Sequence, residues 1–144
     1  MEAIKLLERV MEIAANVLAE STPLRRRFQH RLAKAYIASG RMTAAAMLLE
    51  RVVDIEATVL AEADPLLLRS QQRLARAYMA TGQLKEAITL LEHVVAVKEG
   101  VLAEDNPSRL KSKHILARAY KERGEEKSRS WSRSKGRRGD RKEG

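Results

Sequence analysis

The chain repeats its own sequence with a period of 42 residues. The segment LAKAY at 32–36 returns as LARAY at 74–78 and at 116–120, and LLERV at 6–10 returns at 48–52 and, as LLEHV, at 90–94. Such a period is typical of a solenoid, in which each repeat is one supersecondary unit that buries its apolar face against its neighbours. A stacked array that presents a long surface to a partner is therefore expected.

Two helical patterns, one longer and one shorter, alternate along the repeats. Apolar residues recur at helical spacing, and aromatic residues make up only 3% of a chain rich in Ala, Leu, Glu, Lys and Arg. The connecting loops are short, so consecutive helices must be antiparallel neighbours. We predict an all-α array of three helical hairpins over residues 1–124. Its helices lie at about 2–20, 24–38, 43–62, 66–80, 85–104 and 108–122.

Residues that start and stop helices frame each shorter segment. A capping side chain precedes a proline at its start, which suits the first helical position, and a glycine follows its end, where a left-handed backbone is needed. These residues are Thr22, Asp64, Asn106, Gly40, Gly82 and Gly124.

The repeat resembles the tetratricopeptide repeat. Residues 32–36 read L-A-x-A-Y, and Ala45, Leu49 and Pro65 follow at the family's alanine, large apolar and closing proline positions. The common repeat has about 34 residues. The additional residues fall between Ala45 and Pro65 and lengthen the second helix by about two turns. This form resembles the kinesin-light-chain type and the repeat arrays of fungal NACHT or NB-ARC receptor proteins. The resemblance implies a right-handed α-solenoid whose shorter helices line a concave groove that holds extended peptides.

Both ends of the chain depart from the repeat. The chain opens inside a helix of the longer type, and segment 125–144 is rich in Ser, Arg, Gly and Lys with almost no apolar residues. Such a composition predicts a basic disordered tail. The chain is expected to be a fragment or truncated form of a larger repeat protein.

Charge is sorted by helix type. The net charge is +9, and Glu122 is the only acidic residue in the three shorter helices. If Leu32 and Tyr36 face the core, residues 27, 30, 31 and 34 share another face, which recurs in each copy. Arginine suits carboxylates because its planar guanidinium group binds both oxygens. The predicted peptide-binding groove comprises Arg27, His30, Arg31, Lys34, Arg69, Gln72, Arg73, Arg76, Lys111, His114 and Arg118.

These residues predict a non-catalytic protein–protein interaction scaffold that binds acidic peptide segments in a basic concave groove. His30, Gln72 and His114 would form a hydrogen-bonding column within it. The simpler interpretation is that the charges are solvated helix faces. One alternative function is nucleic-acid binding through the basic tail. Another is self-association through the unpartnered end near Ile115, Leu116 and Tyr120.

Several classes of site are not indicated. The chain has no cysteine, so disulfides and thiolate metal sites are excluded. His30 and His114 lie two layers apart and His93 belongs to the other helix type, which argues against a metal site. Glycine-rich phosphate loops and nucleophile elbows are absent, so no catalytic residue and no cofactor are predicted. Without a long apolar run or a basic secretory start, the chain is predicted to be cytoplasmic and not membrane-bound.

Overall fold

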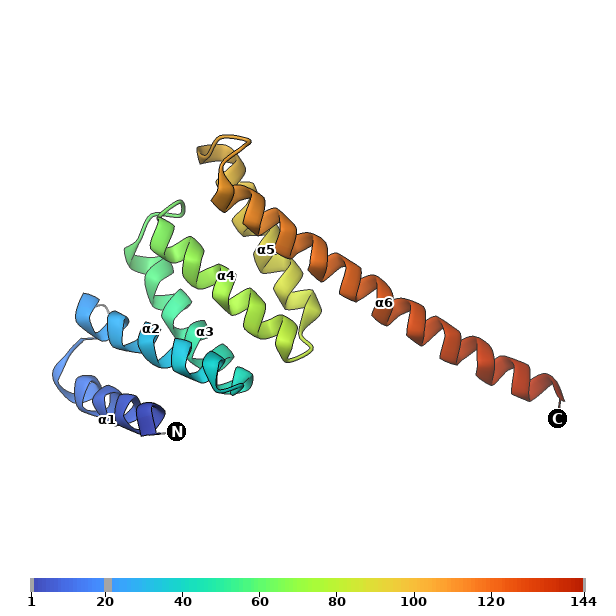
Figure 1. Ribbon diagram of the computed structural model, residues 1–144, viewed down its shortest axis with the longest axis horizontal. Coiled ribbons are helices and arrows are strands. Elements are labelled where there is room, and N and C mark those ends of the chain that lie inside the picture. Colours follow the sequence, from blue (N-terminus) through green and yellow to red (C-terminus); the bar gives the residue numbers. More distant parts are fainter. Residues whose placement is uncertain (1, 20–21, 144) are drawn as a thin grey trace.

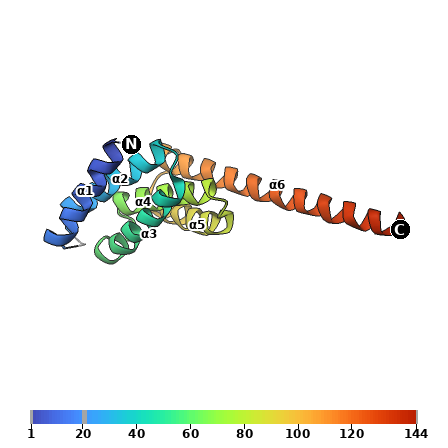
Figure 2. The same ribbon diagram turned by 90° about the horizontal axis from the view of Figure 1, so that it is seen from below.

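The fold is a stack of helical hairpins. The computed structural model describes residues 2–19 and 22–143, with side chains as far as residue 133. Its described part contains α1 (Glu2–Val17), α2 (Pro23–Ala38), α3 (Met42–Val59), α4 (Pro65–Ala80), α5 (Leu84–Val101) and α6 (Pro107–Glu143). The main contacts join consecutive helices, as Figure 1 shows. In Figure 2, α3 and α5 lie on one side of the stack, opposite α2 and α6. The predicted all-α solenoid is confirmed.

The shorter helices begin at the prolines. Asp64 caps α4, since its Oδ1 accepts a hydrogen bond from the backbone N–H of Leu66 at 2.8 Å. Asn106 Oδ1 accepts from the Ser108 N–H at 2.9 Å in the same way. The prediction for Thr22 was wrong, because its side chain makes no capping hydrogen bond. Two of the three predicted caps therefore satisfy a backbone donor that the first helical turn leaves free.

The longer helices end earlier than predicted, at Val17, Val59 and Val101. Leu60 and Leu102 follow α3 and α5 with extended backbones at ψ 154° and 149°. The apolar pattern that predicted longer helices therefore continues into the first residues of the loops, where the backbone is already extended. At the other end of the hairpins, Gly40 and Gly82 adopt φ of 80° and 82°, a left-handed conformation that confirms their role as helix stops.

Gly124 does not end α6, contrary to the prediction. It has no positive φ, and the described helix continues past it to Glu143. The disorder predicted for residues 125–144 stays a prediction. After Gly40 and Gly82 the chain turns back into an apolar helix that packs on the preceding one. After Gly124 no apolar segment follows, and residues 125–133 are all exposed along a helix that projects from the stack (Figure 1). A turn there would bury nothing, so tertiary packing gives no reason for the helix to stop.

Small residues let the helices approach closely. Ala33, Ala45, Ala75 and Ala87 are fully buried beside large apolar side chains such as Leu91. The small alanine side chains allow neighbouring helices to pack in close contact.

The tyrosines of the repeat occupy the edge of the core. Tyr36 is buried, whereas Tyr78 and Tyr120 donate hydrogen bonds to Glu50 and Glu92, each at 2.8 Å. Burial, followed by the hydrogen bond to Glu50, raises the pKa of Tyr78 to about 12. The rings pack against the array while the hydroxyls tie the two helix types together.

Candidate peptide-binding groove

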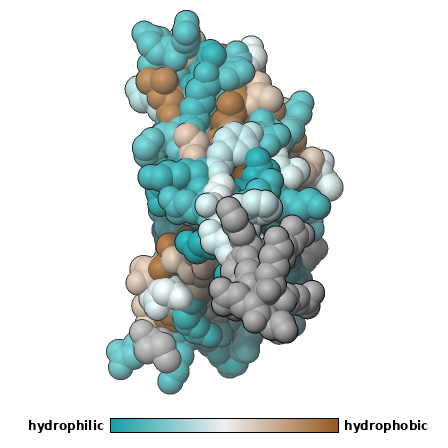
Figure 3. All heavy atoms as spheres, turned by 90° about the vertical axis from the view of Figure 1, so that its right-hand side faces the viewer, coloured by the Kyte–Doolittle hydropathy of each residue, from teal (hydrophilic) through white to brown (hydrophobic). Residues whose placement is uncertain are grey.

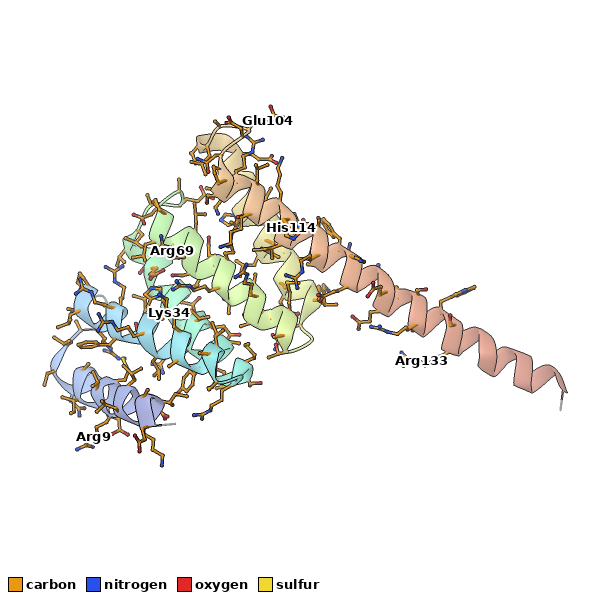
Figure 4. The ribbon with its side chains drawn as sticks, in the orientation of Figure 1. Arg9, Lys34, Arg69, Glu104, His114 and Arg133 are labelled. Carbon is orange, nitrogen blue, oxygen red and sulfur yellow. The ribbon has the colours of Figure 1, made fainter. Side chains whose placement is uncertain are left out.

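Three adjoining hollows lie against α4, and together we call them the basic groove. The first, of about 360 Å³, lies between α2 and α4. The second, of about 380 Å³, lies nearer the other ends of these helices. The third, of about 650 Å³, is bounded by α4, α5 and the start of α6. Arg73 lines all three, so the hollows form one continuous surface. Figure 4 shows Lys34 and Arg69 on α2 and α4, within this surface.

Most of the residues predicted for the groove meet there. Nine of them line its hollows: Arg27, His30, Arg31, Lys34, Arg69, Gln72, Arg73, Arg76 and Lys111. The remaining two, His114 and Arg118, are exposed on α6 and line none of the three. The register of the repeat therefore brings together the cations of α2 and α4 with Lys111 of α6, while His114 and Arg118 lie beyond the groove.

The lining of the basic groove is positively charged. No acidic residue in the described part of the chain lines its hollows. Burial lowers the pKa of Arg73, the positive charge of Arg69 lowers it further, and Glu56 opposes both effects. Packed cations of this kind repel one another weakly in solvent but attract an anionic ligand together.

Beneath the hollow between α2 and α4 lies a buried polar group that sequence reasoning missed. The Glu56 side chain of α3 is fully buried, and its Oε1 lies 2.7 Å from His30 Nε2. Ser70 Oγ lies 3.4 Å from the same nitrogen and donates to the Leu66 carbonyl at 3.0 Å. Glu56 thus places one negative charge under the cations of this hollow.

One repeat later the equivalent positions are Gln72, Lys98 and Ser112. Lys98 Nζ donates to Ser112 Oγ at 2.7 Å, and it reaches Gln72 Oε1 at 3.4 Å. Ser112 Oγ also donates to Gln72 Oε1, at 2.6 Å. The same three positions therefore hold a buried carboxylate in one layer and a buried ammonium in the next.

These contacts correct the expected column of His30, Gln72 and His114. The three residues do not bond to one another, because each side chain of the column is a full repeat away from the next. His30 and Gln72 instead bond to Glu56 and Lys98 of the longer helices. A signal for this was present in the sequence, since residues 49, 52 and 56, like 91, 94 and 98, share one helical face with the core. A charge on that face indicates a buried polar contact.

The predicted self-association end is less apolar than expected. Ile115 is only 2% exposed because it packs into the core of α4 and α5. Leu116 is half-buried, and Tyr120 is exposed but bonded to Glu92. The surface visible in Figure 3 is mainly hydrophilic, with hydrophobic residues in separate patches.

Neither a metal-binding cluster nor a membrane-spanning helix is present among the described residues. No group of three or more His, Cys, Asp or Glu side chains is placed to hold a metal ion. Among the same residues, the helices are too short or too polar to cross a membrane.

Comparison with known proteins agrees with the geometry. Two family models, each described as a tetratricopeptide repeat, match residues 27–58 and 67–108. These ranges correspond to the pairs α2 with α3 and α4 with α5. No curated protein matches the chain.

Two solved structures are similar to it. Both are of a putative kinesin light chain from Podosopora anserina with nearly identical TPR-like repeats, and one of the two is a variant with a single substitution. Each is 50% identical, with TM-scores of 0.80 for the variant and 0.79 for the other. The match covers 85% of this chain and 58% of the solved one, so the chain spans little more than half the length of these relatives. The repeat period, the helical stack and these matches together show that the chain belongs to the tetratricopeptide repeat family.

Proposed function

We propose that the protein is a non-catalytic interaction scaffold whose basic groove binds an extended acidic peptide segment. The tetratricopeptide repeat fold supports a role in protein–protein interaction. The observation that carries the acidic specificity is the groove lining, in which cations of α2 and α4 face one another across hollows without an acidic residue among the described ones. An extended chain fits because the three hollows adjoin one another, two between α2 and α4 and the third bounded by α4, α5 and α6.

The chemistry of the lining suits carboxylates. Arg69, Arg73 and Arg76 lie on α4 at spacings of three and four residues, so they project from one helix face. Guanidinium groups bind carboxylates through two parallel hydrogen bonds. Attraction over this surface is also expected to speed encounter with an acidic segment. A cytoplasmic location and a longer parent array, such as a NACHT or NB-ARC receptor, stay predictions.

Charge reversal in the groove tests the proposal. The double substitution Arg73→Glu with Arg76→Glu is expected to weaken binding of a fluorescein-labelled, glutamate-rich peptide at least about tenfold, because it replaces attraction by repulsion at the centre of the groove. Fluorescence anisotropy measures the affinity. Circular dichroism is expected to show unchanged helicity, since Arg76 is exposed and Arg73 half-buried.

The matched control is Arg129→Glu with Arg133→Glu. It makes the same change in net charge on exposed residues of α6, outside the groove. Affinity that survives the groove substitutions, or that falls equally in the control, would contradict the proposal. Deleting residues 125–144 distinguishes peptide binding from the nucleic-acid alternative, because only nucleic-acid binding requires the basic segment.

A further inference from the structure

The buried Lys98 differs from every other cation of the groove. Its side chain is only 6% exposed, yet it lines the hollow between α4, α5 and α6, which we call the Lys98 hollow. Its Nζ donates to Ser108 Oγ at 2.9 Å, in addition to Ser112 Oγ and Gln72 Oε1. All of these acceptors are neutral. No ion pair of Lys98 exists within the residues that the structure describes.

A buried ammonium group without a counter-ion is costly to the fold. Burial lowers the pKa of Lys98, and the neighbouring Lys111 lowers it further. The equivalent residue of the preceding layer, Glu56, has the opposite charge and contacts His30. Nothing in the repeat pattern therefore requires a cation at this position, and packing alone would be better served by an apolar side chain.

The surroundings of Lys98 are suited to an anion with more than one charge. Arg69, Arg73, Arg76 and Lys111 line the same hollow, and no described acidic residue does. Ser108 and Pro107, in the first turn of α6, also line it, so the positive end of the helix dipole adds to the field. A carboxylate brings one negative charge, whereas a phosphoryl group brings nearly two and three acceptor oxygens.

We infer that the Lys98 hollow binds a phosphoryl group carried on a serine or threonine of the groove peptide. The inference rests on the proposed peptide function and makes it more specific: the α2 and α4 cations hold the acidic chain, and Lys98 with Lys111 and the Ser108 hydroxyl receives the phosphate. The partner is thus a phosphorylated acidic segment.

Three peptides that differ at one central residue test this inference. The residue is serine, glutamate or phosphoserine in an otherwise identical glutamate-rich sequence. Wild-type protein is expected to bind the phosphoserine form about tenfold more tightly than the glutamate form by fluorescence anisotropy. Equal affinity for these two forms overturns the inference but leaves the proposed function intact. Failure of all three to bind would contradict the proposed function as well.

Substitutions of two lysines test whether the phosphoryl group binds in the Lys98 hollow. Lys98→Met is expected to reduce the preference for phosphoserine to about twofold or less while the melting temperature stays equal or rises, because an uncompensated buried charge is removed. Lys111→Met, at an exposed residue, is expected to reduce the preference without affecting the fold. The matched control is Lys85→Met, since Lys85 is an exposed lysine at the start of α5 and outside the groove.

Two results would overturn the assignment. The first is a lower melting temperature in Lys98→Met together with an unchanged phosphoserine preference in Lys111→Met, which would make Lys98 a structural residue. The second is inorganic phosphate raising the melting temperature of the wild type, but not of Lys98→Met, without any preference for phosphoserine. That pattern would assign the hollow to the free anion.

Discussion

Alanine sets the distance between helices at the centre of the stack. Ala75 of α4 is fully buried against Ala87, Leu91 and Ile115. Ala75→Leu is expected to destabilise the protein by roughly 1–3 kcal/mol, because the added atoms must push α5 and α6 away from α4. Thermal or urea unfolding followed by circular dichroism measures the change.

The control is Ala80→Leu, the same substitution in the same helix at an exposed position. Surface changes away from special contacts alter stability by about 0.5 kcal/mol or less. Equal stability of the two variants would show that α4 does not pack at Ala75 as the structure has it.

Two buried charged residues make consecutive layers of the stack chemically different. Glu56 and Lys98 occupy equivalent positions on α3 and α5, but the first faces a histidine and the second only neutral groups. The repeat backbone is therefore reused with opposite charges, which makes the two layers of the groove chemically distinct. An interaction surface built from copies of one unit can in this way recognise an asymmetric ligand.

Residues 125–133 of α6 have no buried side chain. Residues 125–133 are exposed and project from the stack. Isolated helices of this length are marginal in water, and most helical stability comes from packing an apolar face. Deleting residues 125–144 is therefore expected to leave the melting temperature of the stack within about 2 °C.

Circular dichroism of the two chains also measures the helix itself. If the segment is helical in solution, its removal lowers the total helical signal while the signal per residue stays nearly constant. Warming should melt this helix gradually, before the cooperative transition of the stack. A signal per residue that rises clearly on deletion would contradict a helix that extends to Glu143.

Salt is expected to act in opposite directions on binding and on folding. The groove concentrates cations, and Arg69 and Arg73, like Lys98 and Lys111, repel each other in the folded chain. Raising the sodium chloride concentration from about 0.05 to 0.5 M shortens the screening length. It is expected to weaken glutamate-peptide binding about tenfold or more and to leave the melting temperature equal or slightly higher.

Anisotropy and thermal unfolding in the same buffers measure the two effects. The Arg73→Glu, Arg76→Glu variant serves as the control, because its peptide affinity should depend much less on salt. Affinity of the wild type that does not change with salt would contradict binding by electrostatic attraction.

Periodicity by itself determined the fold of this protein. Copies in register specify which residues meet in the core, and the prolines and two of the glycines specify where helices begin and turn. The cations of α2 and α4 could be assigned to one surface because three- and four-residue spacing fixes a helix face. Such signals depend only on residue types and their spacing along the chain, so the sequence alone is sufficient to detect them.

Only the tertiary structure decided which partners the buried polar residues have and how far α6 extends. Glu56 contacts His30, and Lys98 donates hydrogen bonds to Ser108 and Ser112. Each contact joins two helices, so it depends on how far the side chains extend between them. The sequence already shows that almost no apolar residue follows Gly124, but only the structure shows that α6 continues past this glycine to Glu143. In both cases the outcome depends on what lies beside a residue in space, which a one-dimensional pattern does not contain.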